Sequence, residues 1–165
     1  MRNTTPIIVL LFSLLIASAS ACADSTVAEG IQQKVQPMMK ALSLIGTPYK
    51  FGGNNPEKGV DCSGFVRHVY KESAGIALPR TAKEISQAGA TISENELQPG
   101  DLVFFNTRKK AFSHVGIYAG NGEFVHASSS KTKKVTVSNM NDNYWSARFN
   151  GARRILTDAL PSLGQ

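Results

Sequence analysis

The sequence has 165 residues, of which 42% are hydrophobic and 18% are charged, and its formal net charge is +6 at pH 7. That length suits one domain, the hydrophobic content excludes wholesale disorder, and a mean hydropathy of −0.14 excludes a polytopic membrane protein. Two cysteines are too few for a disulfide-dense miniprotein or for a four-cysteine zinc site.

The first 23 residues have the pattern of a secretory signal. Arg2 precedes a run at residues 6–16 that is apolar except for one serine, and small residues follow up to Ala23. The run is shorter than the roughly 20 residues that a membrane-spanning helix needs. Cleavage after Ala23 would release a soluble protein, whereas cleavage before Cys22 would leave a cysteine that can carry lipid. We expect export to the periplasm or cell envelope, with soluble secretion preferred and membrane attachment through lipid on Cys22 as the alternative.

Basic residues gather at three places in the remaining chain, at residues 108–110, 131–134 and 153–154. A positively charged exported protein is attracted to anionic polymers and to membrane surfaces. Nucleic acid is the obvious anionic partner inside a cell, and export argues against it. We therefore predict no nucleic-acid partner.

The first predicted helix begins at a capping box at residues 26–29 and ends at Gly46. Its apolar residues recur at spacings of three and four, which is typical of an amphipathic helix. These residues are Val27, Ile31, Val35, Met38, Leu42 and Ile45. Residues 47–60 are rich in Gly, Asn and Pro and are predicted to form a loop.

Two further helices are predicted after this loop. Asp61 caps a helix that ends near Gly75, and a second capping box at residues 81–84 opens a short third helix. The residues of the second helix expected to face the core are Phe65, Val66, Val69 and Tyr70.

After residue 98 the hydrophobic period becomes that of strands. A turn at residues 98–101 precedes a short apolar run, and two later apolar runs flank the glycine-rich residues 120–122, which is typical of a hairpin. The predicted strands are residues 102–105, 115–118, 123–126, 135–138 and 148–156. Helices followed by antiparallel strands predict an α+β fold with N-terminal helices packed on a C-terminal antiparallel sheet, in a single domain.

Cys62 is the cysteine that remains once the signal region is set aside. An unpaired thiol in an oxidising compartment is a liability unless it is buried or used, so one interpretation is an inert buried cysteine. The other follows from its position in the first turn of the helix capped by Asp61, where the helix dipole favours the thiolate and lowers the thiol pKa. The small residues Ser63 and Gly64 would let a substrate approach the sulfur.

A cysteine nucleophile needs a histidine base, and the chain has three histidines. His68 follows Cys62 on the same predicted helix by nearly two turns, too far to touch it, so no catalytic role is expected. His114 and His126 lie at the outer ends of the two hairpin strands. A three-residue hairpin loop at residues 119–121 places them directly opposite each other on one face, whereas a shift by one residue places them on opposite faces.

Zinc is the competing interpretation, because two histidines and a cysteine can bind it at a catalytic site. A cysteine at a helix start and histidines on strands suit proton transfer better, and the sequence offers no nearby acidic cluster to support a metal. We therefore predict no metal and no cofactor.

Several segments, in this order and spacing, resemble the NlpC-type cell-wall peptidases. They are residues 46–53, 61–66, 78–81, 99–105, 114–118 and 124–127. The resemblance covers roughly residues 35–157, which leads us to expect a signal at 1–23, a peptidase domain at 24–157 and a tail at 158–165. It implies a papain-like α+β fold and hydrolysis of amide bonds in peptidoglycan stem peptides.

The resemblance also implies roles for single residues. Cys62 matches the nucleophile, His114 the general base, and His126 the third, polar position that orients the base. Tyr49 matches a tyrosine near the developing oxyanion, where its hydroxyl could donate a hydrogen bond, although a loop aromatic packed on the core is an equal alternative.

Three more positions match the family near the nucleophile. In some relatives the residues that flank the cysteine bind the free amine of an N-terminal L-Ala, which would make Asp61 and Ser63 substrate contacts. The simpler interpretation is that Asp61 caps the helix and Ser63 fills its first turn. Arg80 also matches, with no role beyond contact with a substrate carboxylate.

Several functional alternatives stay open at this stage. The D-Glu–diamino-acid link is the favoured bond, and the D-Ala–diaminopimelate crosslink is the alternative within the same enzyme class. A catalytically inactive cell-wall binding protein is an alternative of another class, and an exported effector acting on a competitor's wall is a further one. No wall-binding module is recognisable in the sequence.

Overall fold

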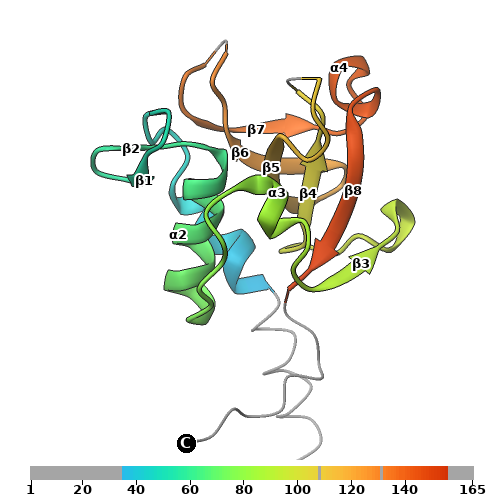
Figure 1. Ribbon diagram of the computed structural model, residues 1–165, viewed down its shortest axis with the longest axis horizontal. Helices are drawn as coiled ribbons and strands as arrows, with labels where there is room; N and C mark the ends of the chain where they lie inside the picture. Colours follow the sequence, from blue (N-terminus) through green and yellow to red (C-terminus); the bar gives the residue numbers. More distant parts are fainter. Residues whose placement is uncertain (1–34, 108, 131, 156–165) are drawn as a thin grey trace, which may run out of the picture.

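The computed structural model describes residues 35–107, 109–130 and 132–155 (Figure 1). The predicted signal at residues 1–23, the capping box at 26–29 and the tail at 158–165 lie outside the described residues. Arg108 and Lys131, which belong to two of the basic clusters, lie outside them as well.

An antiparallel sheet of six strands forms the larger part of the described chain, in the order β3-β8-β4-β5-β6-β7. The strands are β3 (Ala90–Ile92), β4 (Leu102–Phe105), β5 (His114–Gly120), β6 (Glu123–Ala127), β7 (Val135–Asn139) and β8 (Phe149–Arg154). Figure 1 shows the longer helices on one side of this sheet. The predicted α+β architecture is therefore confirmed, and each predicted strand is present with ends that differ by a few residues.

The helices that precede the sheet are a helix at residues 35–43, α2 (Cys62–Ala74) and the short α3 (Ala82–Ile85). Asp61 caps α2 as predicted, since its side chain accepts from the Gly64 N–H, and Gly75 ends α2 with a left-handed φ of 69°. The four residues of α2 expected to face the core are all buried. Within the described ranges, no helix is both long and apolar enough to cross a lipid bilayer.

The helix at residues 35–43 buries a different stripe from the one expected. Leu42 and Ile45 are exposed, whereas Ala41 is fully buried in the core and Leu44 packs against it. Both stripes keep the spacing of three and four that defines a helix face, so the periodicity could not choose between them.

Strand β4 lies in the middle of the sheet and is buried on both faces. Leu102 and Phe104 join the core beneath the helices, and Val103 and Phe105 join a second apolar cluster on the opposite face. This two-sided burial explains why β4 is an unbroken apolar run rather than an alternating one.

Five short elements were not predicted. Strands β1 (Asn54–Asn55) and β2 (Gly59–Val60) form a hairpin inside the expected loop, and β3 extends the sheet at its edge. The 3₁₀ turn η1 (Glu94–Glu96) and the helix α4 (Asn143–Ser146) complete the set. Elements of two to four residues have too little periodicity to be recognised in a sequence.

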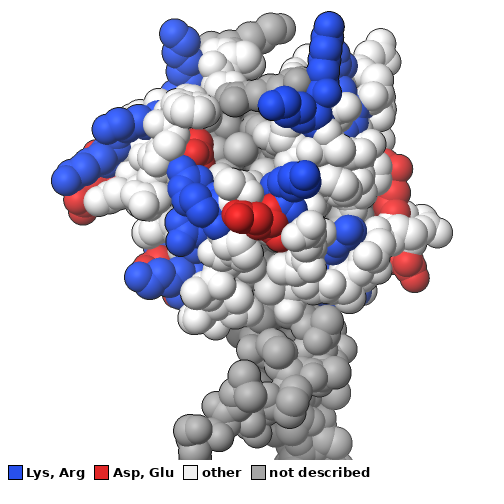
Figure 2. All heavy atoms as spheres, viewed as in Figure 1, with Lys and Arg blue, Asp and Glu red and all other residues white. Residues whose placement is uncertain are grey.

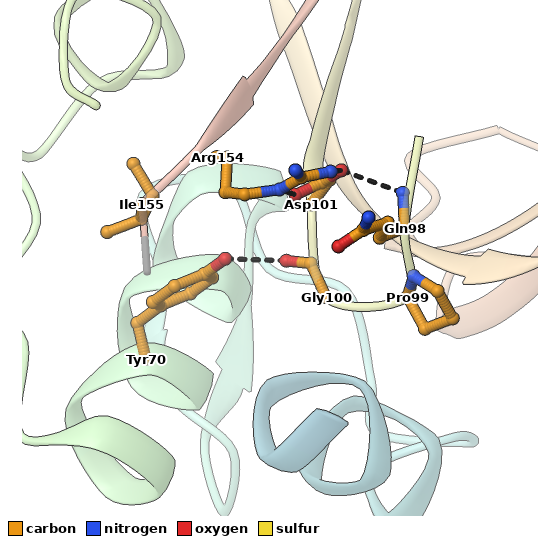
Figure 3. Close-up of a pocket in the computed structure, with 7 residues that line it drawn as sticks. All are labelled: Tyr70, Gln98, Pro99, Gly100, Asp101, Arg154 and Ile155. Atoms are coloured by element: carbon orange, nitrogen blue, oxygen red, sulfur yellow. Dashed lines mark hydrogen bonds and ion pairs between the residues drawn. The ribbon is translucent and has the colours of Figure 1, made fainter. Parts of the chain in front are cut away.

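Polar contacts join α2 and β8 to the turn at residues 98–101, directly before β4 (Figure 3). The Tyr70 hydroxyl of α2 donates to the carbonyl oxygen of Gly100 over 2.6 Å, and Arg154 of β8 binds Asp101 with N–O distances of 2.7 and 2.8 Å. Burial raises the pKa of Tyr70 far above its usual range, so the phenol stays a donor. These bonds fix α2 and β8 to the start of β4.

Candidate active site

The β5–β6 hairpin determines how the two strand histidines meet. Ile117 pairs with Val125, so the strands are shifted by two residues from the predicted register, and His126 lies opposite Gly116 instead of opposite His114. The turn consists of two residues, Asn121 and Gly122, both with positive φ, instead of the expected three-residue loop. The register is irregular between residues 118 and 120, as at a β-bulge. A shift by two keeps side chains on the same face, so the predicted shared face is confirmed and the direct pairing is wrong.

His114 and His126 form a direct hydrogen bond. The distance from His114 Nε2 to His126 Nδ1 is 2.9 Å, and the two rings are nearly perpendicular, at 82°. Gly116 makes this possible, because a Cβ at that position would lie 3.2 Å from the Cβ of His126 and 2.6 Å from the Phe124 ring. The Nδ1 of His114 is then the nitrogen that can exchange a proton with a reacting group.

His126 has a second partner on the next strand. Its Nε2 lies 3.0 Å from the Oγ of Ser138 on β7, so Ser138, His126 and His114 form one hydrogen-bonded chain. Burial, and to a smaller extent the charge of His114, lowers the pKa of His126 to about 2. His126 is therefore neutral, and its Nδ1 can accept a hydrogen bond from the Nε2–H of His114.

The only tryptophan of the chain covers this pair. Trp145 of α4 stacks on the His114 ring, with centroids 5.6 Å apart and an interplanar angle of 28°. It also meets the His126 ring edge-on at 5.0 Å. Water is kept from the bond between the histidines, which are only 8% and 1% exposed. Neither Ser138 nor Trp145 was singled out from the sequence.

Cys62 is the first residue of α2, as predicted, and it is partly buried. It packs against the core cluster that contains Val115 of β5 and Ala127 of β6. Helix α2 contacts both of these strands, so the fold brings the helix start toward the strands that bear the histidines. The N-terminal end of a 13-residue helix favours an anionic sulfur.

A cleft opens at this end of α2 and contains most of the predicted site residues. Its lining is formed by Tyr49, Phe51, Gly52, Asp61, Cys62, Ser63, Arg80, Thr81, Ala82 and Ser113. Ser113 directly precedes His114, so the cleft reaches the loop that leads into β5. His114 and His126 are buried and are not among the residues that line the cleft.

Asp61, Ser63 and Arg80 form one network in the cleft. Arg80 makes a two-pronged ion pair with Asp61, at 2.7 and 3.2 Å, and also donates to the Ser63 hydroxyl over 2.8 Å. Burial raises the pKa of Asp61, but hydrogen bonds from Arg80 and from the Gly64 N–H outweigh it and leave that pKa below its usual value. Asp61 is therefore a stable carboxylate.

Gly64 has a different purpose from the one expected. It is buried, and a Cβ added to it would lie 2.0 Å from the Gly53 carbonyl oxygen. The small residue lets the loop before β1 lie against the start of α2, so the idea that Gly64 opens a path to the sulfur is wrong.

Tyr49 satisfies part of both expectations. It packs against the core cluster and also lines the cleft, and its N–H donates to the Lys133 carbonyl oxygen over 2.8 Å. The loop that contains Lys133 therefore borders the cleft, as does the β4–β5 loop that contains Lys109 and ends at Ser113. Lys109 and Lys133 are exposed, and Figure 2 shows basic side chains toward this end of the molecule.

The part of the chain that contains this site is similar to known proteins. Residues 46–154 match the NlpC/P60 family. The chain belongs to the NlpC/P60 family. The solved structures confirm the papain-like α+β fold of this NlpC/P60 domain: a crystal structure of a lipoprotein-like NLP/P60 family protein from Staphylococcus aureus matches with a TM-score of 0.66 and 36% identity. The match covers 79% of this chain and 42% of that one.

Two curated relatives of this NlpC/P60 protein are named for different activities. Gamma-DL-glutamyl hydrolase of Bacillus subtilis is 41% identical over 128 residues, which are 77% of this chain and 30% of the relative. Murein DD-endopeptidase MepS/Murein LD-carboxypeptidase of Escherichia coli is 46% identical over 112 residues, 68% of this chain and 57% of the relative. The chain thus spans less than two thirds of each relative.

The remaining histidine lies apart from the cleft of the NlpC/P60 domain. His68 is half-buried on α2 and does not line the cleft, which agrees with the prediction that it has no catalytic role. Burial lowers its pKa. In the ranges that the structure describes, no three His, Cys, Asp or Glu side chains gather as a metal site would require.

Proposed function

We propose that this protein is a cysteine peptidase that hydrolyses amide bonds in peptidoglycan stem peptides. The observation that supports this most is the 2.9 Å bond between His114 and His126, together with a cleft that is lined by Cys62 and by Ser113, the residue directly before His114. A wall-binding protein without chemistry would need neither the bond nor its cover of Trp145. The family membership and the names of the relatives point to the same activity.

The first half of the reaction transfers the acyl group to sulfur. The Cys62 thiolate attacks the carbonyl carbon of the stem peptide, and the carbonyl oxygen becomes an oxyanion. Backbone N–H groups at the start of α2 and the Tyr49 hydroxyl are the donors proposed for this oxyanion. The C–N bond breaks as the His114 imidazolium gives its proton to the leaving nitrogen, and neutral His126 holds the His114 ring in place.

The second half returns the enzyme to its starting state. His114, now neutral, takes a proton from a water molecule as that water attacks the thioester carbonyl. The C–S bond breaks, the carboxylic acid leaves, and the Cys62 thiolate and the His114 imidazolium are restored. The reaction needs no cofactor.

The D-Glu–diamino-acid link is the bond that we propose, because one relative is named as a gamma-DL-glutamyl hydrolase. The D-Ala–diaminopimelate crosslink is the second candidate, because another relative is named as a DD-endopeptidase. Purified peptidoglycan digested with the wild-type protein and with Cys62→Ala, followed by mass analysis of the products, tests both. New amino termini on the diamino acid at the glutamyl link would support the first candidate. Unchanged peptidoglycan with the wild-type protein would overturn the proposed activity.

The proposed place of action is the cell envelope outside the cytoplasm. The signal-like residues 1–23 and the basic loops beside the cleft support it, since peptidoglycan bears carboxylates. Mass analysis of the processed amino terminus decides between cleavage after Ala23 and a lipid-bearing Cys22. Retention in the cytoplasm with an intact signal would contradict export.

A further inference from the structure

The carboxylate of Asp61 is fully used inside the protein. Its Oδ1 accepts from the Gly64 N–H, the Ser63 hydroxyl and Arg80, and its Oδ2 accepts from the Gly52 N–H and a second Arg80 nitrogen. These are five hydrogen bonds on two oxygens, whose lone pairs offer about four acceptor sites. Asp61 is also only 8% exposed. Although Asp61 lines the cleft, an ammonium group of a substrate would find little exposed surface and no available lone pair on its carboxylate.

The guanidinium of Arg80 differs in both respects. Its bonds to Asp61 and Ser63 use three of its five N–H groups within the part of the chain that the structure describes. The side chain is 38% exposed and lines the cleft beside Cys62. The ion pair with Asp61 fixes the plane of the guanidinium, so its remaining donors are held ready for an acceptor.

The charges around this position favour an anion over a cation. Asp61 and Arg80 neutralise each other, and the N-terminal end of α2 adds partial positive charge beside them. The hydrogen bond and charge of Asp61, and further the charge of Cys62, raise the pKa of Arg80 against the effect of burial. The guanidinium therefore keeps its charge beside the nucleophile.

We propose that Arg80 binds the free α-carboxylate of a γ-linked glutamate next to the scissile bond, and that Asp61 positions Arg80 instead of binding an amine. The inference rests on the proposed function, because it assigns the substrate contact of that same cleft. A γ-linked glutamate keeps its α-carboxylate free, so stem peptides supply the group. It follows that acylation of the stem-peptide amine, as in an intact wall, does not hinder binding.

Calorimetry with the Cys62→Ala protein tests this inference without turnover. The ligands are an L-Ala-γ-D-Glu-diaminopimelate peptide, its N-acetylated form, and its form with the glutamate α-carboxylate converted to a carboxamide. Amidation should raise Kd about tenfold, as expected for the loss of one charged hydrogen-bonded pair, and N-acetylation should change Kd less than about threefold. A tenfold loss on N-acetylation with no effect of amidation would overturn the proposal, as would failure of all three peptides to bind.

Second variants separate recognition from folding. In the Cys62→Ala background, Arg80→Gln should bind the acid and the carboxamide equally, and Arg80→Lys should keep part of the preference for the acid. Lys83→Gln removes a neighbouring exposed charge on α3 and serves as the matched control with an unchanged preference. An acid preference that survives Arg80→Gln in a protein with unchanged Tm would refute the contact.

Failure of the proposed function gives a different result from failure of the inference. If the wild-type protein digests peptidoglycan and its binding shows no carboxylate preference, only the assignment of Arg80 fails. If the carboxylate preference is present and wild-type protein leaves peptidoglycan intact, only the peptidase activity fails.

Discussion

Replacement of His126 by alanine tests how the histidine pair works. During the reaction His114 must hold a positive charge while it is only 8% exposed, and its Nε2–H then donates to His126 Nδ1 over 2.9 Å. His126 can accept because burial keeps it neutral, with a pKa of about 2. The variant removes this acceptor and leaves a charged N–H without its partner.

The expected size follows from the cost of that lost bond. A hydrogen bond to a charged group contributes about 1.5–3 kcal/mol, which corresponds to about a 10- to 150-fold loss of kcat/KM. The same free energy destabilises the His114 imidazolium, so the pKa of His114 should fall by about 1–2 units. The high-pH limb of the activity profile, where His114 loses its proton, should move down by that amount. His114→Ala should be more damaging, because it removes the proton carrier itself.

The assay is kcat/KM for a defined stem peptide across the pH range of stability. His126→Gln offers an amide oxygen as acceptor and should restore part of the rate and of the high-pH limb. His68→Ala, a half-buried histidine on α2, is the matched control and should leave the profile unchanged. A rate loss in His126→Ala with an unmoved high-pH limb would refute the orienting role and reduce His126 to a packing residue.

Three further predictions concern the surroundings of this pair. Ser138→Ala leaves the buried Nε2 of His126 without its partner, so it should lower the unfolding free energy by about 1–3 kcal/mol, and it should lower kcat by less than His126→Ala does. Ser86→Ala, which removes a buried hydroxyl elsewhere, is the control for stability alone. An unchanged urea midpoint for Ser138→Ala would contradict the bond. The unfolding free energy should fall by at most about 1.4 kcal/mol per pH unit as the pH drops below about 6.5, because His126 gains a proton there only in the unfolded chain. Urea midpoints at pH 7 and 5 should show a smaller fall for His126→Gln. Gly64→Ala should lower the unfolding free energy by about 1–3 kcal/mol, because the added Cβ would lie 2.0 Å from the Gly53 carbonyl oxygen. The change should appear as a lower Tm, and an unchanged Tm would show that this approach is not tight.

The sequence predicted the helix start at Cys62 because capping is a local property. Asp61 and Gly75 sit at the two ends of α2, and both signals depend only on a few neighbouring residues. The hairpin was harder, since Asn121 and Gly122 allow more than one turn and a bulge changes the count. The shared face of His114 and His126 survived a wrong register because parity, rather than the loop length itself, determines the face.

Ser138 and Trp145 could not have been found in this way. Ser138 reaches His126 only because β7 pairs with β6, and Trp145 reaches both histidines from a helix of four residues. Strand order and the return of a short helix over a sheet depend on the packing of the whole chain. The single tryptophan was the one available signal, since an aromatic of that size is seldom left without a packing role.

The network of Asp61 shows why a motif match can name the right residue and the wrong role. A helix cap and a substrate contact both use the oxygens of the same carboxylate, and the sequence reveals only that Asp61 suits each. The choice depends on Arg80, a residue 19 positions away, and on the backbone of Gly52, which together complete the five hydrogen bonds on Asp61. Five donors of the protein already occupy the roughly four acceptor sites of the Asp61 carboxylate, so we assign substrate recognition to the N–H groups of Arg80 that Asp61 and Ser63 do not use. The sign of the charge that the cleft prefers is thus a property of the folded network and not of the residues beside Cys62.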